Sequence, residues 1–458
     1  MDGSELRGRK VKRRTTNERE ALRVLNLSRY FRVTERTRKQ SFGESPDPVT
    51  SMSQAISAAR AGVAPFSNSA PDPNAIELSV VLPCLNESDT VATCIRKALA
   101  ALRESGIAGE VVVADNGSTD GSIEIAEREG ARVVRVPAKG YGSALMGGIE
   151  AARGRYILMG DADDSYDFGE LPKFVMKLRE GYDLVQGCRL PAGGGKVDSG
   201  AMPLLHRWWG NPMFSWMVRR WFRAPIHDVH CGMRAFTKTL YARLDQRCTG
   251  MEFASEQVIK ASIHGARIAE VPITLHKDGR TTHAPHLKTF RDGWRHLRFY
   301  LMFSPRWLFL LPGILLALFG LAGFALAMPQ SRIRGITFDV NTLLFASLAI
   351  VCGYQSVLFA FLTKFFAMAE GMLPVDERVM KFGRIVNLER GLMLGGVSIL
   401  VGVALLATTI LRWRAHGYGQ MDYAVSLRTT IPGMTLTVLG FQTVLWSFFV
   451  SILGLKRK

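Results

Sequence analysis

The sequence predicts an α/β domain with a mostly parallel sheet, followed by a C-terminal region of four transmembrane helices. Two observations favour this fold class. Apolar runs of strand length alternate with amphipathic helical patterns over residues 76–285, which is typical of a parallel sheet with helices on both faces. After residue 306 the chain contains four long apolar stretches. The 47% share of hydrophobic residues, beside 58 basic and 40 acidic side chains, therefore reflects two regions of opposite character.

The first 75 residues are predicted to be a basic tail and linker. Residues 1–39 carry thirteen Lys or Arg against five acids, without the apolar core of a secretory signal peptide. Residues 40–75 are rich in Ser, Pro and Ala, as linkers are. The segment is interpreted as a disordered tail or as an extended start upstream of Met52, and a tether to anionic lipid is the alternative. The net charge of +18 suits a membrane surface better than nucleic acid.

The strands of the α/β domain are expected to end along one edge of the sheet. Pro83, Asp115 and Asp161 each lie where a predicted strand stops, and ligands bind at that edge in open α/β folds. The predicted strands are 77–83, 110–115, 131–137, an apolar strand that starts at Tyr156, 183–189 and 270–276. The predicted helices include 91–102, 141–152 and 250–262.

The stretch from Tyr156 to Asp164, YILMGDADD, is the predicted reaction centre. It is an apolar run that ends in three carboxylates. In extended geometry Asp161 and Asp163 point to the same side and Asp164 to the other. Two carboxylates on one side form a hard-oxygen site for Mg²⁺ or Mn²⁺, and such an ion usually carries substrate phosphates as well. The alternative is a strand that runs into an Asp-rich turn.

Four ordered motifs carry a family resemblance. These are SVVLPCLNE, VVVADNGSTDGS, AKGYGSALMGGIEAARG and the DAD stretch. In this order and spacing they resemble the nucleotide-sugar half of the GT-A fold family 2 glycosyltransferases, and within that family the polyprenyl-phosphate (dolichyl-phosphate) glucosyl and mannosyl transferases. The resemblance covers about residues 77–300. It implies a GT-A nucleotide-sugar-binding domain over residues 76–285.

The resemblance implies a nucleoside pocket at the ends of the first two strands. Pro83, Leu85 and Glu87 would line it, with the Glu87 carboxylate accepting hydrogen bonds from ribose hydroxyls. Asp115 matches the acid that recognises the nucleobase side of the donor. Family members often have a second acid where this chain has Asn116, whose amide can still hydrogen-bond a base edge.

The resemblance also implies where the donor diphosphate is bound. Asp161 and Asp163 would hold the Mg²⁺ or Mn²⁺ against it. Lys139 lies in the Gly-rich turn before the helix 141–152, where a cation and backbone N–H groups can bind anions, although a solvated lysine is the alternative. Arg189 ends another strand and completes the predicted donor-binding set.

The predicted catalytic residues are Asp163, Glu256 and Arg280. Glu256 lies on the helix 250–262, where an acid approaches the acceptor in the family, and a solvated i,i+4 pair with Glu252 is the alternative. Arg280 is the candidate in the loop KDGRTTHAPHLK, where family members have an Arg over the donor phosphates. Lys277 is the second candidate, because the family's usual Ser-Lys ending is absent here.

The acceptor side is predicted from two further segments. DVHCGMRAF, residues 228–236, resembles the family's D-x-x-x-G-x-R turn and carries Asp228 and Arg234. Residues 286–306 are predicted to be an amphipathic interfacial helix, whose Arg291 and Arg295 suit a lipid phosphate. Its apolar stripe consists of Phe290, Trp294, Leu297 and Leu301. The Trp-rich segment 206–222 is either a second such helix or a buried one.

Four membrane spans are predicted, at about residues 307–329, 340–363, 391–411 and 429–455. Each has the ~20 residues that cross ~30 Å of hydrocarbon. Lys and Arg number fifteen in the flanks and loop on one side and five in the two loops on the other. The positive-inside rule then puts the catalytic domain and both termini in the cytoplasm of a multi-pass inner (plasma) membrane protein. Such helix pairs can also pack as a homo-oligomer.

Together these features predict a transfer of sugar to a lipid. The expected donor is a nucleotide-sugar such as UDP-glucose or GDP-mannose, and the expected acceptor is polyprenyl phosphate within membrane lipids. The product would be a lipid-linked sugar for cell-envelope glycosylation, formed with inversion. The alternatives are another lipid or polysaccharide acceptor, or a non-catalytic sugar-lipid scaffold or translocase. The Q-x-x-R-W motif of processive polysaccharide synthases does not occur in the sequence.

Overall fold

The computed structural model describes residues 75–281, 289–369, 373–374, 376–379, 381 and 388–454 of the 458-residue chain. Four parts of the predicted segments lie outside the described residues: the tail up to residue 74, residues 282–285 of the α/β domain, residues 286–288 of the interfacial helix and residue 455 of the fourth span.

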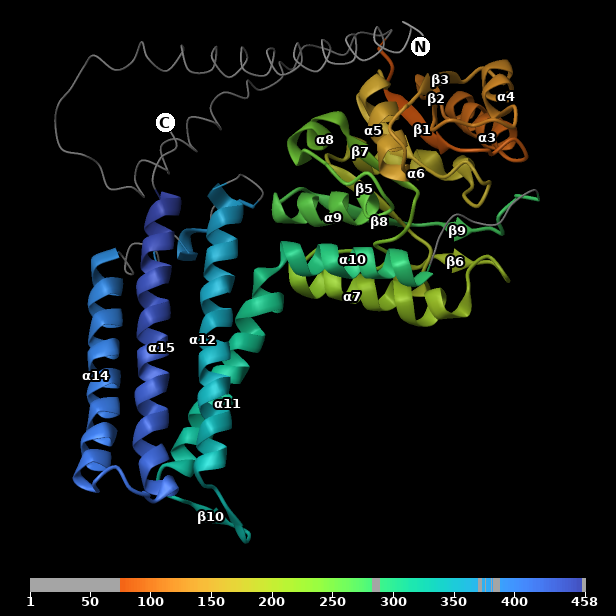
Figure 1. Ribbon diagram of the computed structural model, residues 1–458. Coiled ribbons are helices and arrows are strands. Elements are labelled where there is room, and N and C mark those ends of the chain that lie inside the picture. Colours follow the sequence, from red (N-terminus) through yellow and green to blue (C-terminus); the bar gives the residue numbers. More distant parts are fainter. Residues whose placement is uncertain are drawn as a thin grey trace, which may run out of the picture. The chain divides into compact units, whose positions relative to one another are not determined.

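A seven-stranded sheet forms the centre of the α/β domain (Figure 1). The strand order is β3-β2-β1-β4-β7-β5-β8. Every neighbouring pair is parallel except the two pairs made by β7, which runs antiparallel to β4 and β5. The predicted mostly parallel sheet is therefore confirmed. The bounds are β1 Leu78–Cys84, β2 Gly109–Asp115, β3 Arg132–Arg135, β4 Tyr156–Met159, β5 Leu184–Cys188, β7 Arg234–Thr237 and β8 Ile268–Pro272.

Helices cover both faces of this sheet, because its central strands are apolar on both sides. In β1, Val80 and Leu82 belong to one buried cluster and Val81 to the other. The first cluster includes residues of α3 (Val91–Glu104), α4 (Ser122–Arg128) and α6 (Leu171–Arg179). The second includes residues of α5 (Tyr141–Ala151), α7 (Asn211–Phe222), α8 (Lys238–Leu244), α9 (Phe253–Ile263) and α10 (Thr289–Phe303).

Two predicted segments differ from the structure. The predicted strand 270–276 is divided, because the chain leaves the main sheet after Pro272 and its next strand, β9 (Thr274–Leu275), pairs with β6 (Lys196–Val197). The predicted turn 228–236 ends in strand β7, which fills the space between β4 and β5. Both pairings join segments far apart in the sequence, so local patterns could not reveal them.

Helix α10 has two contrasting faces. Its His296 and Tyr300 are buried, and the Tyr300 ring contacts Phe214 of α7 edge-on at 5.7 Å. Phe290 and Trp294 of the predicted stripe are 86% and 60% exposed. Leu297 of the same stripe packs against the domain core, so only the N-terminal half of the predicted apolar face is turned away from the domain.

The segment 206–222 combines both predicted alternatives. It forms a π-helical turn, His206–Gly210, followed by α7. Phe214 and Phe222 are buried against the sheet, whereas Trp208, Trp209 and Trp216 are exposed. One face is therefore core and the other is an aromatic surface.

Among its described residues, the C-terminal region contains four helices long and apolar enough to cross a membrane, as predicted (Figure 1). The spans are Arg306–Ala327, ending in α11 (Leu311–Ala327); α12 (Val340–Ala369); α14 (Leu388–Ala415); and α15 (Tyr423–Gly454). A small hairpin, β10 (Arg332–Ile333) and β11 (Ile336–Thr337), lies between the first two. Helices α11 and α12 pack as one pair and α14 and α15 as another.

Polar side chains connect the two helix pairs through α12 and α15. The hydroxyls of Ser347 and Thr435 lie 2.6 Å apart, as do those of Tyr354 and Thr443. Within a hydrocarbon layer each such pair satisfies hydroxyls that would otherwise lack partners. The four helices therefore form one packed unit.

Candidate functional site

The strand order places the ends of three strands, β1, β2 and β4, side by side at the C-terminal edge of the sheet. Cys84, the last residue of β1, is the register partner of Asp115, the last residue of β2. On its other side β1 pairs with β4, which leads into the acidic stretch. The direction of the connections reverses between β1 and β4, which is the point where open α/β sheets bind ligands.

The carboxylate of Asp161 lies between Tyr141 and Gly232. The hydroxyl of Tyr141, the first residue of α5, donates to Asp161 Oδ1 at 2.8 Å. A Cβ at Gly232 would lie 2.4 Å from Asp161 Oδ2, so a larger residue there would displace the Asp161 carboxylate. Asp163 accepts from the backbone N–H and the hydroxyl of Ser165 at 3.1 and 2.6 Å.

The two acids form an electrostatically unfavourable pair. Burial and then the charge of Asp163 raise the pKa of Asp161 to about 6. Among the described residues, no group of three or more His, Cys, Asp or Glu side chains gathers as a metal cage. Two mutually repelling carboxylates fit Mg²⁺ or Mn²⁺, which take few protein ligands and complete their coordination with phosphates and water.

Asp164 is separated from this pair by a turn, rather than by strand alternation. Strand β4 ends at Met159, and Asp164 has a left-handed φ of 61°. Its carboxylate accepts from Lys97 Nζ of α3 at 2.7 Å. The extended geometry assumed from the sequence was therefore wrong, although the grouping of Asp161 with Asp163 holds.

Arg280 connects two acids that come from different strand ends. Its guanidinium donates to both carboxylate oxygens of Glu87 at 2.7 Å and lies 3.4 Å from Asp163 Oδ2. The backbone N–H of Gly279 donates to the Asp163 carbonyl at 3.0 Å, which fixes this loop beside the acids. Lys277, the other candidate in the loop, is exposed. Glu87, Asp163 and Arg280 are thus brought together as one cluster.

The turn after β2 is tightly hydrogen-bonded. The Asp115 carboxylate accepts from the N–H groups of Gly117 and Ser118 at 2.9 and 3.0 Å. Lys139 Nζ donates to the backbone carbonyl of Asn116 at 2.5 Å, so its ammonium is held at this turn. Pro83 and Leu85 lie nearby along the end of β1 and are partly exposed.

Arg189 and Asp228, predicted for the donor and acceptor sides respectively, form a buried ion pair with each other. Arg189 Nε and Nη2 donate to the two carboxylate oxygens of Asp228 at 2.7 and 2.9 Å. The Tyr166 hydroxyl accepts from the N–H of Gly232 at 2.8 Å and lies 3.4 Å from Arg189 Nη1. The pair therefore supports the turn that packs against Asp161.

Arg234 is wholly buried and contacts backbone. Its guanidinium donates to the carbonyls of Ala254, Val229 and Cys231 at 2.6, 3.3 and 2.5 Å. It therefore ties the turn before β7 to the start of α9, which leaves its guanidinium inside the protein.

Glu256 is also buried and serves a loop. Its carboxylate accepts from the N–H groups of Arg247 and Cys248 at 2.8 to 3.1 Å and pairs with Lys260 at 2.7 Å. The next residue of that loop, Thr249, accepts from the N–H of Gly142 at the start of α5. Glu256 thereby helps to position α5.

Arg291 and Arg295 lie on the surface of α10. Their side chains are 55% and 41% exposed, and both lie within 3.7 Å of the Asp292 carboxylate. They remain accessible to a ligand in solution or at a membrane surface.

Two contributors to the site were not predicted from the sequence. Tyr141 belongs to the motif AKGYGS, and its position one residue after a Gly-rich turn was an available signal. Tyr166 follows the acids, and its role depends on Gly232, which comes 66 residues later. Nothing local in the sequence indicates that contact.

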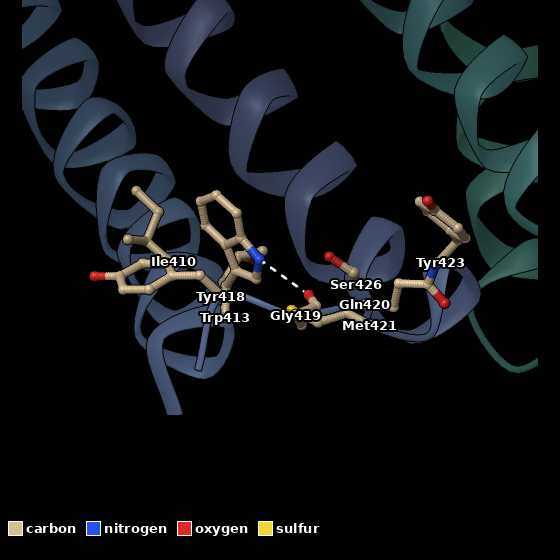
Figure 2. Close-up of a pocket in the computed structure, with 9 residues that line it drawn as sticks. Ile410, Trp413, Tyr418, Gly419, Gln420, Met421, Tyr423 and Ser426 are labelled. Carbon is tan, nitrogen blue, oxygen red and sulfur yellow. Dashed lines mark hydrogen bonds between the residues drawn. The ribbon is translucent and has the colours of Figure 1, made fainter. Parts of the chain in front are cut away.

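A cavity of about 550 Å³ lies elsewhere, at the connection between α14 and α15 (Figure 2). Trp413, Tyr418 and Tyr423 are among its lining residues, and Trp413 Nε1 donates to the Gly419 carbonyl at 3.2 Å. None of the acids described above lines it. Tyr and Trp are enriched at the ends of membrane spans, which accounts for these rings.

Two family models match the chain. Residues 79–244 match the model described as glycosyl transferase family 2, and residues 361–454 match the family 2 C-terminal transmembrane region.

Individual proteins are similar as well. The low-salt glycan biosynthesis hexosyltransferase Agl6 of Haloferax volcanii is 38% identical over 82% of this chain and 89% of the relative. The dolichyl-phosphate hexose transferase of the same organism is 33% identical over 43% of this chain and 82% of the relative. A crystal structure of glucosyl-3-phosphoglycerate synthase from Mycobacterium tuberculosis, in complex with Mn²⁺, UDP and glucosyl-3-phosphoglycerate, is 22% identical. It covers 57% of this chain and 85% of that chain, with a TM-score of 0.39.

Proposed function

Because this chain belongs to the family 2 glycosyltransferases and is a membrane glycosyltransferase, we propose that it transfers a sugar from a nucleotide-sugar to polyprenyl phosphate. One observation carries this proposal. The cluster of Glu87, Asp163 and Arg280, together with the neighbouring Asp161, lies at the edge of the sheet where open α/β folds bind ligands, in a chain that continues into four membrane spans. The similarity to the dolichyl-phosphate hexose transferase of Haloferax volcanii supports a polyprenyl acceptor.

The donor diphosphate is assigned to the pair of acids. Asp161 and Asp163 would hold Mg²⁺ or Mn²⁺, which when bound offsets the charge of the departing nucleoside diphosphate. The hydroxyl of Tyr141 keeps Asp161 in one orientation, and the N–H and hydroxyl of Ser165 do the same for Asp163. The acids are thus fixed before the donor arrives.

Glu87 and Arg280 are assigned to the ribose and the phosphates. Their charged groups pair with each other, and Arg280 also contacts Asp278 and Asp163. A nucleotide-sugar brings a replacement for each, since ribose hydroxyls can donate to Glu87 and phosphate oxygens can accept from Arg280. Donor binding therefore exchanges one set of charged hydrogen bonds for another. Asp115 and Lys139 complete the donor site at the base end.

The reaction does not require a general base. The second pKa of a phosphate monoester is about 6, so at neutral pH the acceptor is already largely a nucleophilic oxyanion. This agrees with the position of Glu256, whose carboxylate is fully engaged by the loop before α9. The acceptor oxygen attacks the anomeric carbon as the diphosphate leaves, which inverts an α-linked donor to a β-linked polyprenyl phosphate sugar.

The acceptor phosphate is assigned to the surface of α10. Arg291 and Arg295 are exposed cations on the helix whose Phe290 and Trp294 also face outward. Exposed aromatic residues beside cations are typical of helices that lie in a lipid headgroup layer. Asp228 and Arg234 are assigned to the fold of the neighbouring turn, because their charged groups are buried.

The exposed Trp residues before and within α7 extend the same kind of surface. Trp221, near the end of α7, stacks on Trp307 at the start of the first membrane span, with 5.3 Å between ring centroids. We assign the face with Trp208, Trp209 and Trp216 to the headgroup layer. With the distribution of Lys and Arg, this supports a catalytic domain on the cytoplasmic side of the plasma membrane.

The test is a transfer assay with a donor panel. Membranes containing the full chain are incubated with radiolabelled UDP-glucose, GDP-mannose or UDP-N-acetylhexosamine, together with polyprenyl phosphate and Mg²⁺. We expect labelled lipid with one donor, loss of the product in Asp163→Asn and little change in the matched variant Asp164→Asn, because Asn tolerates the left-handed turn. No labelled lipid with any donor, or full activity in Asp163→Asn, contradicts the proposal.

A further inference from the structure

We propose that Asn116 is a positioning residue of the donor site. This position requires a side-chain amide, because the Asn116 side chain donates two hydrogen bonds to the segment 136–140. This inference rests on the proposed donor site and goes further, since it links the base end of that site to the metal-binding acids.

Both N–H groups of the Asn116 side chain are occupied by backbone. Nδ2 donates to the carbonyls of Val136 and Ala138 at 3.1 and 2.7 Å. The side-chain oxygen accepts from the N–H of Gly140 at 2.8 Å. Asn116 itself is 5% exposed. The amide is therefore committed to the protein, and the expectation that it hydrogen-bonds a base edge does not fit this geometry.

These contacts fix a cation at the base-binding turn. The Lys139 ammonium returns to the Asn116 carbonyl at 2.5 Å. It lies directly over Gly117, where an added Cβ would be 2.2 Å from Nζ. Lys139 belongs to the segment that the Asn116 amide holds, so its ammonium cannot keep this place if the segment moves.

The same segment sets the position of a metal-binding acid. Gly140 immediately precedes α5, whose first residue is Tyr141. The Tyr141 hydroxyl donates to Asp161 Oδ1. Asn116 thus acts on Asp161 through two hydrogen bonds and one peptide bond. Its side-chain oxygen accepts from the N–H of Gly140, Gly140 is bonded to Tyr141, and the Tyr141 hydroxyl orients the Asp161 carboxylate.

Aspartate at position 116 would match asparagine in shape but not in hydrogen bonding. A carboxylate has no N–H groups, so its oxygens would face the carbonyl oxygens of Val136 and Ala138. It would also be a buried charge beside two acceptors, which is unfavourable. A protonated carboxylic acid regains one donor. The need for a donor can therefore be detected as a dependence on pH.

The experiment measures binding of UDP and of GDP, each with Mn²⁺, by calorimetry on the purified full chain in detergent. We expect Asn116→Asp to weaken binding of the preferred nucleotide at least tenfold at pH 8. The ratio of its affinity to that of the natural chain should rise as the pH falls to 5.5. Asn116→Ser, which has no titrating group, should also bind the nucleotide more weakly, but the ratio of its affinity to that of the natural chain should not change with pH. Asn341→Asp makes the same chemical change at an exposed site and should bind normally.

Thermal melting of each variant separates positioning from folding. Normal affinity in Asn116→Asp at both pH values overturns the inference, even if the variant melts at a lower temperature. If Asn116→Asp does not fold, normal affinity in Asn116→Ser overturns it instead. If the natural chain binds neither nucleotide with Mn²⁺, the proposed function is contradicted. If the natural chain and its variants bind equally well, only the inference about Asn116 is contradicted.

Discussion

Arg280 and Glu87, 193 residues apart in the sequence, form a two-point ion pair in which Nε and Nη2 each lie 2.7 Å from a carboxylate oxygen. The same guanidinium lies 3.4 Å from Asp163. The loop after β9 is thereby fastened to the residues after β1 and to the acids after β4. Residues that we assign to the ribose and to the phosphates of the donor are therefore in contact with each other.

Replacing Arg280 tests this arrangement directly. In Arg280→Lys the point charge remains, but an ammonium cannot make the planar two-point contact with Glu87 or with a phosphate. Hydrogen bonds to charged groups contribute about 1.5–3 kcal/mol, so the transfer rate should fall about tenfold or more. Lys277→Met removes the exposed cation three residues earlier and should change the rate little. A larger loss of rate in Lys277→Met than in Arg280→Lys, measured in a transfer assay, would assign the phosphate-binding role to Lys277.

Replacing Tyr141 tests how Asp161 is held. Tyr141→Phe removes the hydroxyl that donates to Asp161 Oδ1 and leaves the ring in place. One hydrogen bond contributes about 1 kcal/mol, so the Mn²⁺ concentration for half-saturation should rise about fivefold. Electron paramagnetic resonance of Mn²⁺ with UDP measures this without turnover. Tyr182→Phe is the control, because the Tyr182 ring packs under Arg267; equal Mn²⁺ binding in all three proteins would refute the role of Tyr141.

The buried histidine of α10 predicts acid sensitivity of the fold. Burial lowers the pKa of His296 to about 4, although Glu252 and Asp292 act in the other direction. An unfolded histidine has a pKa near ~6.5, so below that pH the unfolded state takes up the proton first. Stability is full above pH ~6.5 and falls as the pH drops toward 4, by about 2 kcal/mol at pH 5.

Thermal melting between pH 7.5 and 4.5 measures this effect. His296→Gln keeps a polar group beside Ser255 but does not titrate, so its melting temperature should fall less with acid than that of the natural chain. His230, buried beside it, adds to the sensitivity that remains. Identical pH profiles for the two proteins would show that His296 is not the source.

Two adjacent glycines in α14 offer a matched test of membrane packing. A Cβ at Gly395 would lie 2.8 Å from the Gly440 carbonyl and 2.7 Å from the Val444 side chain in α15, whereas a Cβ at Gly396 would meet nothing within 4 Å. Gly395→Val should therefore separate the helices and lower the melting temperature in detergent by several degrees. Gly396→Val should melt like the natural chain. Equal melting of the two variants would mean that this contact does not hold α14 to α15.

Much of the architecture follows from local patterns in the sequence. The strands around Val80 and Val112 are apolar without alternation because both of their faces are covered, and the membrane spans are long because each must cross the hydrocarbon layer. The acids at 115, 161 and 163 could be placed at one edge because parallel strands end together. These inferences need only the period and length of a segment.

The roles of individual charged residues could not be predicted in the same way. Arg234 and Arg280 are both arginines in family-like motifs, yet one donates to three carbonyls inside the protein and the other pairs with acids of the site. Glu256 and Glu87 differ similarly, since one holds a loop and the other faces Arg280. Whether such a group meets backbone or ligand depends on contacts between distant segments, which no local pattern encodes.

The carbonyl of Thr249, which accepts from the first amides of α5 at 2.9 and 3.3 Å, changes how this site retains its donor. The N-terminal end of a helix commonly binds phosphates, but at α5 the carbonyl oxygen of Thr249 occupies that position. Under the proposed function, the negative charge of the donor diphosphate is then met by a dissociable cation and by Arg280, and not by the dipole of α5. Recognition of the diphosphate therefore depends on side chains and a metal ion rather than on the backbone of this helix.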